Sequence, residues 1–329
     1  MKELTAELKK YKQVYVVCDR NVEKFARSLD CARDDKGRGN LLAITADEAH
    51  KTIDTVMDIC RWLRDSGADR DALVLAVGGG VTTDMAGFAA SIYKRGIRYA
   101  NIPTTLLSMV DAGIGGKTGV NLDGYKNLLG VIRQPEFTAI FPEVLETLPE
   151  RELRSGLAEM LKTFIIKNPR NAYERTVAGG PTPELIQLAA SIKQEIVEKD
   201  EFESGLRRKL NLGHTWAHAI EWWQKDSSLD CARDDKFMTH GEAVAIGIVQ
   251  AAKYAERHGI AEEPGLADRI AADLKACGLP TELPCPTEEL LPAILKDKKA
   301  YGSKIKLVLP CRIGKVAVKT VPSESIAEA

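Results

Sequence analysis

Short apolar runs alternate with longer amphipathic stretches over the first third of the chain. The runs VYVVCD at 14–19, DALVLAVGGG at 71–80 and RYANIPTT at 98–105 have the length and apolar content of buried strands. Between them, KTIDTVMDICRWLRDSGA at 51–68 and TTDMAGFAASIYK at 82–94 carry apolar residues at helical spacing. Strands that alternate with helices in this way predict an α/β domain with a parallel sheet.

The hydrophobic pattern and the glycine content of the sequence change near residues 145–150. From TLPERELRSGLAEMLKTFIIK at 147–167 to AVAIGIVQAAKYAERHG at 243–259, helical periodicity dominates and glycine becomes rarer. We therefore expect a Rossmann-like α/β domain over 1–148 and a mainly α-helical domain over 149–329.

Two further segments lie near the C-terminus. KIKLVLP at 304–310 alternates and is apolar enough to predict a strand. The tail SESIAEA at 323–329 is small and polar, and it is expected to be disordered.

Composition excludes several classes of protein. The 329 residues are 44% hydrophobic with a formal net charge of −1, so no charge excess points to nucleic acid or an anionic membrane. No apolar run reaches about eighteen residues, and the N-terminal MKELTAELKKYKQ lacks the apolar core of a signal peptide. The seven cysteines are scattered and never spaced as CxxC, which speaks against a disulfide framework or a thiolate zinc site. We expect a soluble cytoplasmic protein with no nucleic-acid or membrane partner.

The segment VGGGVTTD at 77–84 is a candidate phosphate-binding loop. Glycines after a buried strand let the backbone approach a phosphate, and the following helix offers free amide groups to an anion. The segment is not the GxGxxG fingerprint, so an ordinary Rossmann dehydrogenase is not supported. A tight turn without a ligand is the alternative.

Histidines are scarce and concentrated in two helical segments. His214 and His218 in NLGHTWAHAIE are four residues apart, which places both imidazoles on one helix face, and His240 begins THGEAVAIG. Two histidines and one carboxylate form a common catalytic zinc set, and Glu159 in the apolar SGLAEMLK is the candidate third ligand. The alternatives are two core histidines with satisfied hydrogen bonds and a partly exposed surface glutamate.

Several cations stand in glycine-rich or polar settings. Each alone is typical of a solvated surface charge. Beside a metal site and a phosphate-binding loop, they indicate a small substrate that carries carboxylate and phosphate. They are Arg95, Lys117, Lys126, Lys162, Lys193, Arg207 and Lys298.

The order and content of these motifs resemble the 3-dehydroquinate synthase family over nearly the whole chain. The matching blocks include GGGVTTDMAGFAASIYKRG, IPTTLLSMVDAGIGGKTGVN, TLPERELRSGLAEMLK, GLRRKLNLGHTWAHAIE and HGEAVAIG. The GLAE, GHTxxH and HGEAVA segments are specific to this family and to the related sugar phosphate cyclases. The resemblance implies an N-terminal nucleotide-binding α/β domain, a helical metal-binding C-terminal domain, and an active site in the cleft between them.

The resemblance also implies roles for individual residues. The zinc ligands would be Glu159, His214 and His240. The NAD contacts would be Asp19, Asn21, Glu48, Lys51, Gly79, Gly80, Val81, Asp84, Thr104, Thr105, Lys117, Lys126, Leu145 and Thr147. The catalytic and substrate-binding residues would be Asp111, Lys117, Asn127, Lys162, Lys193, Arg207, Asn211, His218 and Lys298. Arg95 looks like an arginine that reaches the substrate phosphate across a homodimer interface.

The family's reaction converts 3-deoxy-D-arabino-heptulosonate 7-phosphate into 3-dehydroquinate and phosphate, a step of the shikimate pathway. By resemblance, NAD oxidises carbon 5 transiently, phosphate is eliminated, the hydride returns, and ring opening precedes aldol closure. The implied cofactors are NAD and Zn²⁺, with Co²⁺ as a possible substitute. The phosphate itself would take the proton from carbon 6, with His218 as a hydrogen-bonding or relay partner near the metal.

Three other functions remain open at this point. A 2-deoxy-scyllo-inosose or valiolone synthase would use the same loops with a different sugar phosphate; Lys193, Arg207, Asn211 and Lys298 favour a carboxylated substrate. A polyol or glycerol-1-phosphate dehydrogenase would accumulate NADH. A degenerate homologue with a structural role would lack metal and activity, against which the complete ligand trio argues.

Two local features depart from the family pattern. Trp216 and Ala217 stand between the histidines where phenylalanine and glycine are common, and we expect them to alter packing rather than chemistry. DAGIGGKT at 111–118 replaces a serine-bearing segment but keeps Asp111 and Lys117.

The nine residues SLDCARDDK occur twice, at 28–36 and at 228–236, with unrelated flanks. We interpret both copies as insertions tolerated in surface loops, where added length costs little closure entropy.

Overall fold

The computed structural model describes residues 2–29, 40–227, 237–296 and 304–328. The chain divides into two compact units, Met1–Leu148 and Pro149–Ala329. We refer to them as the N-terminal and C-terminal units. Lys298 and the second SLDCARDDK copy lie outside the described residues.

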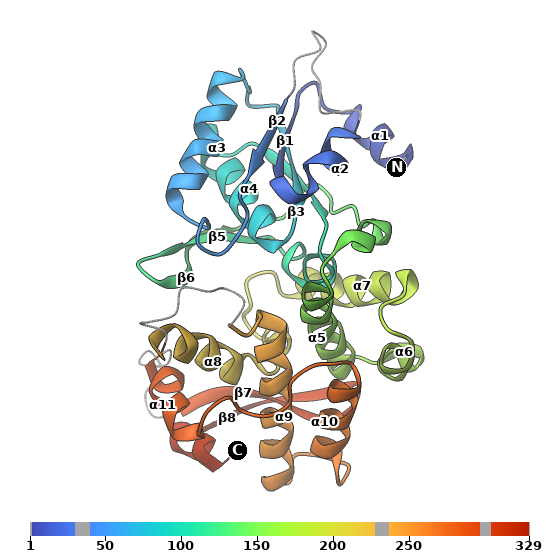
Figure 1. The fold of residues 1–329 in the computed structure, drawn as a ribbon, viewed down its shortest axis with the longest axis vertical. Coiled ribbons are helices and arrows are strands. Elements are labelled where there is room, and N and C mark those ends of the chain that lie inside the picture. The colour runs from blue at the N-terminus through green and yellow to red at the C-terminus, as the bar shows by residue number, and fades with distance from the viewer. Residues whose placement is uncertain (1, 30–39, 228–236, 297–303, 329) are drawn as a thin grey trace. The chain divides into compact units, whose positions relative to one another are not determined.

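The N-terminal unit is built on a four-stranded parallel sheet with the order β2-β1-β3-β4 (Figure 1). Its strands are β1 (Val14–Asp19), β2 (Leu41–Ile44), β3 (Leu73–Gly78) and β4 (Arg98–Pro103). Its α-helices are α1 (Lys2–Leu8), α2 (Glu23–Arg27), α3 (Ile53–Asp65) and α4 (Gly80–Ile92). The strands and helices expected from the hydrophobic pattern are confirmed, as is the parallel sheet.

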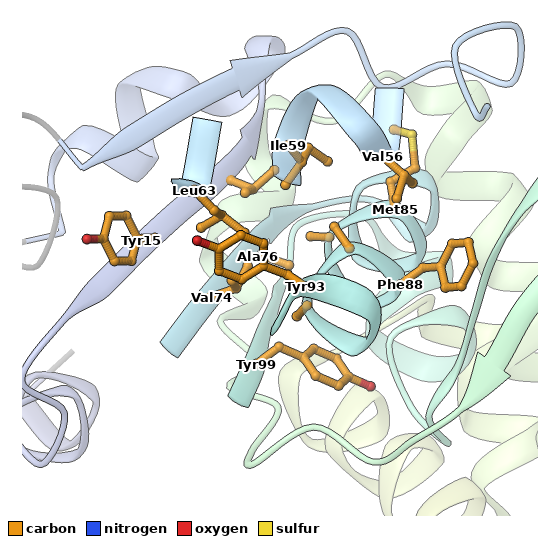
Figure 2. Close-up of a cluster of buried hydrophobic side chains, with 14 of the residues drawn as sticks. Tyr15, Val56, Ile59, Leu63, Val74, Ala76, Met85, Phe88, Tyr93 and Tyr99 are labelled. Atoms are coloured by element: carbon orange, nitrogen blue, oxygen red, sulfur yellow. The ribbon is translucent and has the colours of Figure 1, made fainter. Parts of the chain in front are cut away.

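Side-chain alternation along the strands gives the sheet two apolar faces. Tyr15 and Val17 of β1 point to the face covered by α3 and α4, while Val14 and Val16 point to the face covered by α1 and α2. Figure 2 shows the first cluster, in which α3 and α4 side chains pack against β3. Burial on both faces explains why these strands read as continuous apolar runs.

A two-stranded antiparallel hairpin, β5 (Lys117–Leu122) with β6 (Tyr125–Ile132), follows the sheet. The sequence pattern did not indicate it, because most of β6 is exposed and only Leu129 and Val131 pack against the core. Gly119 and Gly130 pair across the hairpin, where a Cβ on Gly130 would lie 2.2 Å from the Thr118 carbonyl oxygen. These two glycines therefore allow the two strands to pair closely.

The described part of the C-terminal unit contains α-helices, short 3-10 helices and an antiparallel strand pair. Its helices are α5 (Glu150–Ile166), α6 (Ala172–Gly179), α7 (Pro183–Lys199), α8 (His214–Ser227), α9 (His240–Arg257), α10 (Leu266–Ala276) and α11 (Thr287–Lys296). The strands are β7 (Lys304–Arg312) and β8 (Lys315–Pro322). Helix α9 is buried along most of its length and packs against α5, α8, α10 and β7.

The expectation of a disordered C-terminal tail is wrong. Residues Ser323–Glu328 form a 3-10 helix, and Ile326 is fully buried. The hydroxyl groups of Tyr254 and Ser325 share a hydrogen bond of 2.8 Å. The segment also contacts α11 and β8, so tertiary contacts order a stretch whose composition is that of a free tail.

The first SLDCARDDK copy is described only at its first two residues. Leu29 is 3% exposed and packs in the core cluster that covers one sheet face. Leu29 is therefore a core residue, whereas Ser28 is exposed. The remainder of both copies lies outside the described residues, so the insertion hypothesis stays a prediction.

Glycines allow α9 to approach neighbouring backbone closely. A Cβ on Gly247 would lie 2.0 Å from the Gly213 carbonyl oxygen, and a Cβ on Gly241 would lie 2.0 Å from the Ser155 carbonyl oxygen. Because backbone cannot move aside as a flexible side chain can, these contacts specify glycine.

We expect Gly247→Ala to destabilise the protein by about 2 kcal/mol or more, because the added methyl group forces α9 away from Gly213. Urea unfolding measures the change. The matched control is Gly179→Ala in α6, where no atom lies within 4 Å of the added carbon. The control should change stability by less than about 1 kcal/mol. Equal stability of the two variants would contradict the packing argument.

A search of the described residues finds no helix with the length and hydropathy needed to cross a membrane.

Candidate active site

Three elements of the C-terminal unit bring Glu159, His214 and His240 together. Glu159 lies in the middle of α5, whereas each histidine is the first residue of its helix, α8 or α9. Gly213, with φ of +79°, makes the sharp entry into α8 that only glycine adopts readily. Thr239 and Glu242 form a capping box that fixes the start of α9.

Ligand-type atoms of these three residues all lie within 4.8 Å of one another. Glu159 Oε1 is 3.9 Å from His214 Nε2 and 3.4 Å from His240 Nε2. Ligand atoms around a tetrahedral zinc with bonds of about 2 Å are spaced by roughly 3.3 Å. The donor set and its spacing therefore fit a divalent metal such as zinc.

The second nitrogen of each imidazole has its own partner. His214 Nδ1 is 3.1 Å from the Leu212 carbonyl oxygen, and His240 Nδ1 is 3.1 Å from Glu221 Oε1. Such bonds fix the ring orientation and leave Nε2 for a metal. Sequence reasoning missed Glu221, although it stands seven residues after His214 on the same face of α8.

Charge in this cluster is concentrated and buried. Glu159 is fully buried, and its Oε2 lies 2.5 Å from the ammonium nitrogen of Lys162, which is 1% exposed. Burial, together with the Lys162 charge, lowers the pKa of His214 to about 3, so its ring is neutral as a metal ligand must be. Burial also favours a neutral His240, but hydrogen bonds to Glu159 and Glu221 outweigh it and raise the pKa of His240 to about 10, so a metal ion would displace a proton from this ring on binding. Two buried carboxylates thus make this a cation-binding environment.

Removal of the carboxylate behind His240 is expected to weaken metal binding. Glu221→Ala should lower zinc affinity by roughly 10-fold to 100-fold, because the His240 ring loses its orienting hydrogen bond. Competition with a chromophoric chelator measures the affinity. Glu195→Ala on the surface of α7, whose side chain is 44% exposed, is the control. Equal zinc affinity of the two variants would show that Glu221 does not support the metal site.

In the N-terminal unit, the predicted nucleotide contacts gather at the carboxyl ends of the parallel strands. Asp19 ends β1, Gly79 and Gly80 follow β3, and Thr104 and Thr105 follow β4. Chain order reverses between the adjacent strands β1 and β3. Open α/β sheets bind nucleotides outside the carboxyl ends of the strands at such a switch point.

Glycines allow close packing of the backbone at the start of α4. Helix α4 begins at Gly80, so its first amide groups lack acceptors within the helix. A Cβ on Gly80 would lie 2.8 Å from the Ala112 Cβ, and a Cβ on Gly79 would lie 3.1 Å from Thr105 Cγ2. Glycine backbone at a helix start fits a nucleotide diphosphate.

A polar network joins three elements beside α4. The ammonium nitrogen of Lys51, a 5% exposed residue, lies 2.6 Å from Asp84 Oδ2 and donates to Asn127 Oδ1 at 2.5 Å. Asn121 accepts from the Asn127 backbone amide at 2.9 Å and donates to Glu48 Oε1 at 2.9 Å. Sequence reasoning missed Asn121, because its role depends on the hairpin. Asn127 adopts a left-handed φ of +52°, and these bonds stabilise it.

The remaining predicted residues of the N-terminal unit are more dispersed. Asp111 lies in the π-helical turn Ser108–Ala112, and Lys117 begins β5 and lines a small pocket together with Asp84. The Lys126 ammonium nitrogen lies 4.0 Å from Glu48 Oε1, which places it at the edge of the polar network.

Other predicted residues of this unit occupy turns or other contacts. Asn21 donates its backbone amide to Asp19 at 2.9 Å, and Val81 lies in the first turn of α4. Leu145 and Thr147 occupy the 3-10 helix Pro142–Thr147. Arg95 is exposed on a turn with φ of +68°.

In the C-terminal unit, the predicted substrate residues lie on elements next to the metal cluster. His218 is exposed one turn after His214, with ring centroids 5.4 Å apart. Lys193 on α7 and Arg207 are 7% and 3% exposed, and Asn211 donates to Glu203 at 2.6 Å. Trp216, which stands where phenylalanine is common in the family, is 1% exposed and therefore packs in the protein interior.

The family models 3-dehydroquinate synthase N-terminal and 3-dehydroquinate synthase C-terminal match residues 41–155 and 156–300. The chain belongs to the 3-dehydroquinate synthase family. A 3-dehydroquinate synthase of Dictyoglomus thermophilum is 42% identical over 286 residues, covering 84% of this chain and 78% of that protein.

Two of the solved structures similar to this member of the family are sugar phosphate cyclases. A 2-epi-5-epi-valiolone synthase from Streptomyces hygroscopicus with NAD⁺ and Zn²⁺ bound has a TM-score of 0.81 at 29% identity, covering 98% of this chain and 91% of that one. A 2-deoxy-scyllo-inosose synthase in complex with carbaglucose-6-phosphate, NAD⁺ and Co²⁺ has a TM-score of 0.82 at 25% identity, covering 97% and 90%. These likenesses confirm the expected fold class.

Proposed function

We propose that this chain is a phosphate-eliminating carbon–oxygen lyase, EC 4.2.3.4, that converts 3-deoxy-D-arabino-heptulosonate 7-phosphate into 3-dehydroquinate. Its family membership and the buried cluster of Glu159, His214 and His240 support the proposal. The observation that carries it is this cluster, with each histidine held by a second partner. We further propose a homodimer in which the exposed Arg95 contacts the substrate phosphate of the partner's site.

The proposed cofactors follow from the donor sets. Glu159, His214 and His240 would hold Zn²⁺ or Co²⁺, and the strand ends of the N-terminal unit would hold NAD. When bound, NAD would accept and return one hydride, and the metal would act as a Lewis acid toward substrate oxygens. Both would be unchanged over a full turnover.

The chain's own residues bind, orient and shield the substrate. The buried cations Lys162, Lys193 and Arg207 offer charge for carboxylate and phosphate groups in an environment of low dielectric. The exposed His218 beside His214 provides a hydrogen-bonding imidazole that can relay a proton. Much of the rate enhancement would come from holding a flexible sugar phosphate in one reactive conformation.

Incubation with the heptulosonate phosphate, NAD and Zn²⁺ tests the function. Release of phosphate together with formation of dehydroquinate, at catalytic NAD and without accumulation of NADH, is the expected result. Net NADH formation with a polyol would instead identify a dehydrogenase. A metal-free protein that is inert toward the substrate would contradict the proposal.

A second candidate is a cyclase for a sugar phosphate without a carboxylate. The similarity to the 2-deoxy-scyllo-inosose synthase complex favours it. The segment that carries Lys193 and Arg207 matches the 3-dehydroquinate synthase C-terminal family model, which favours the carboxylated substrate. Parallel assays with glucose 6-phosphate and the heptulosonate phosphate distinguish the two candidates.

A further inference from the structure

Asp200 follows α7 and has a buried carboxylate, with 8% of the residue exposed. Its Oδ1 accepts hydrogen bonds from the Ser204 amide at 2.8 Å and the Ser204 hydroxyl at 2.9 Å. Its Oδ2 accepts from the amides of Gly205 at 2.8 Å and Arg207 at 2.9 Å. One side chain therefore fixes the backbone of the whole 200–207 loop.

These hydrogen bonds favour the ionised carboxylate. The amide of Arg207, followed by that of Gly205, holds the pKa of Asp200 well below its usual range. A carboxylate can accept all four bonds at once, whereas a neutral amide in its place would turn one acceptor into a donor. The loop is thus built for a charged acceptor at this position.

The Arg207 side chain makes a second contact between the two ends of the loop. Arg207 is 3% exposed, and its Nη1 donates to the Glu201 carbonyl oxygen at 2.6 Å. Between these two points, Glu203 adopts a left-handed φ of +59°, a conformation that non-glycine residues rarely adopt without support. The Asp200 carboxylate supports Glu203 by fixing the residues that follow it, and the Glu203 amide donates to the Asp200 carbonyl oxygen at 3.4 Å.

Asp200 also joins the elements that carry other candidate residues. Lys193 lies on α7, and Asp200 is the C-cap residue of the same helix. Arg207 lies in the 3-10 helix Leu206–Asn211, and the Leu212 carbonyl oxygen that follows orients His214. A shift of the 200–207 loop would therefore be transmitted to Arg207 first.

We propose that Asp200 is a positioning residue that holds Arg207 for an oxyanion of the substrate. This inference rests on the proposed function, because it assigns Arg207 to substrate binding. Asp200 itself does not contact the substrate. It acts through the Arg207 backbone amide, so its removal should weaken substrate binding without affecting metal content.

The principal test compares Asp200→Asn with wild type on the heptulosonate phosphate. We expect KM to rise by roughly 10-fold to 100-fold and kcat to change much less, because the binding cation is displaced. The double variant with Arg207→Lys should be little worse than Arg207→Lys alone, since both changes act on one contact. Zinc content should remain that of wild type.

Inhibition by inorganic phosphate identifies the oxyanion. An inhibition constant that rises in parallel with KM would assign Arg207 to the phosphate. An unchanged inhibition constant with a raised KM would assign Arg207 to the carboxylate. Either result supports positioning by Asp200.

Two further variants separate positioning from loss of stability. Thr182→Ala removes the N-cap of α7, where the Thr182 hydroxyl accepts from the Leu185 amide at 3.4 Å, and is the matched control at the other helix end. Ser204→Ala removes only the hydroxyl bond and keeps the loop folded if Asp200→Asn does not fold. Ser204→Ala should raise KM by about threefold, whereas Thr182→Ala should lower thermal stability with KM unchanged.

The outcomes distinguish this inference from the proposed function. If wild type neither binds nor converts the heptulosonate phosphate, the proposed function fails and the role of Asp200 fails with it. If wild type is active but the Asp200 and Ser204 variants lose only thermal stability with KM unchanged, the positioning role alone is overturned.

Discussion

Replacement of His214 by alanine is expected to abolish metal binding and to reduce phosphate release by at least about a thousandfold. His214 supplies one of the three candidate ligands, and its Nε2 lies 3.9 Å from Glu159 Oε1. With that imidazole absent, only His240 and Glu159 remain to hold the ion. Metal analysis of the purified variant and a phosphate-release assay measure the two effects.

The control for this experiment is His258→Ala. His258 lies just after α9, is exposed, and stacks on Tyr254 with ring centroids 4.1 Å apart. It should keep full metal content and activity, because it lies outside the candidate cluster. An active, metal-loaded His214→Ala protein would overturn the assignment of the metal site.

Lys162→Met is expected to destabilise the metal-free protein by about 3 kcal/mol. Lys162 and Glu159 form an ion pair of 2.5 Å that is almost completely buried. Removal of the ammonium group leaves the Glu159 carboxylate in the protein interior, with the His240 ring 3.4 Å away as partial compensation. A bound divalent cation would take over the lost charge, so the loss should be smaller in zinc than in chelator.

Urea unfolding in the presence of zinc and in the presence of a chelator measures the loss of stability in the two conditions. Lys167→Met is the matched control, since Lys167 also lies 2.5 Å from a glutamate, Glu195, but with both side chains nearly half exposed. It should cost less than about 1 kcal/mol in either condition. If Lys162→Met destabilised the protein equally with and without zinc, the metal would not compensate the Glu159 charge in place of the lysine, and the argument would fail.

Much of the fold followed from patterns that depend on local burial. β1, β3 and β4 are buried on both faces and therefore read as uninterrupted apolar runs. The β5–β6 hairpin was missed because its second strand is mostly exposed, and its glycines resembled a loop. The C-terminal tail was misjudged because its order depends on tertiary contacts, among them the burial of Ile326.

The three candidate metal ligands could be recognised in the sequence. Two of them are residues of a rare type, and the third is an acidic residue in an apolar segment. His214 and His240 are among only five histidines, and Glu159 is an acidic residue in an otherwise apolar stretch. Supporting residues such as Glu221 and Asn121 could not be chosen in the same way. Polar residues of their kind are common, and only their contacts distinguish them.

The sequence by itself determined the α/β and helical halves, the resemblance to the 3-dehydroquinate synthase family, and which side chains are chemically suited to bind metal, nucleotide and oxyanions. These properties follow from periodicity and residue type, which are local. The tertiary structure alone decided that Glu159 Oε1 lies 3.4 Å from His240 Nε2, and that Asp200 holds the amide of Arg207 at 2.9 Å. The first contact spans helices far apart in the chain, and the second depends on one particular path of a short loop.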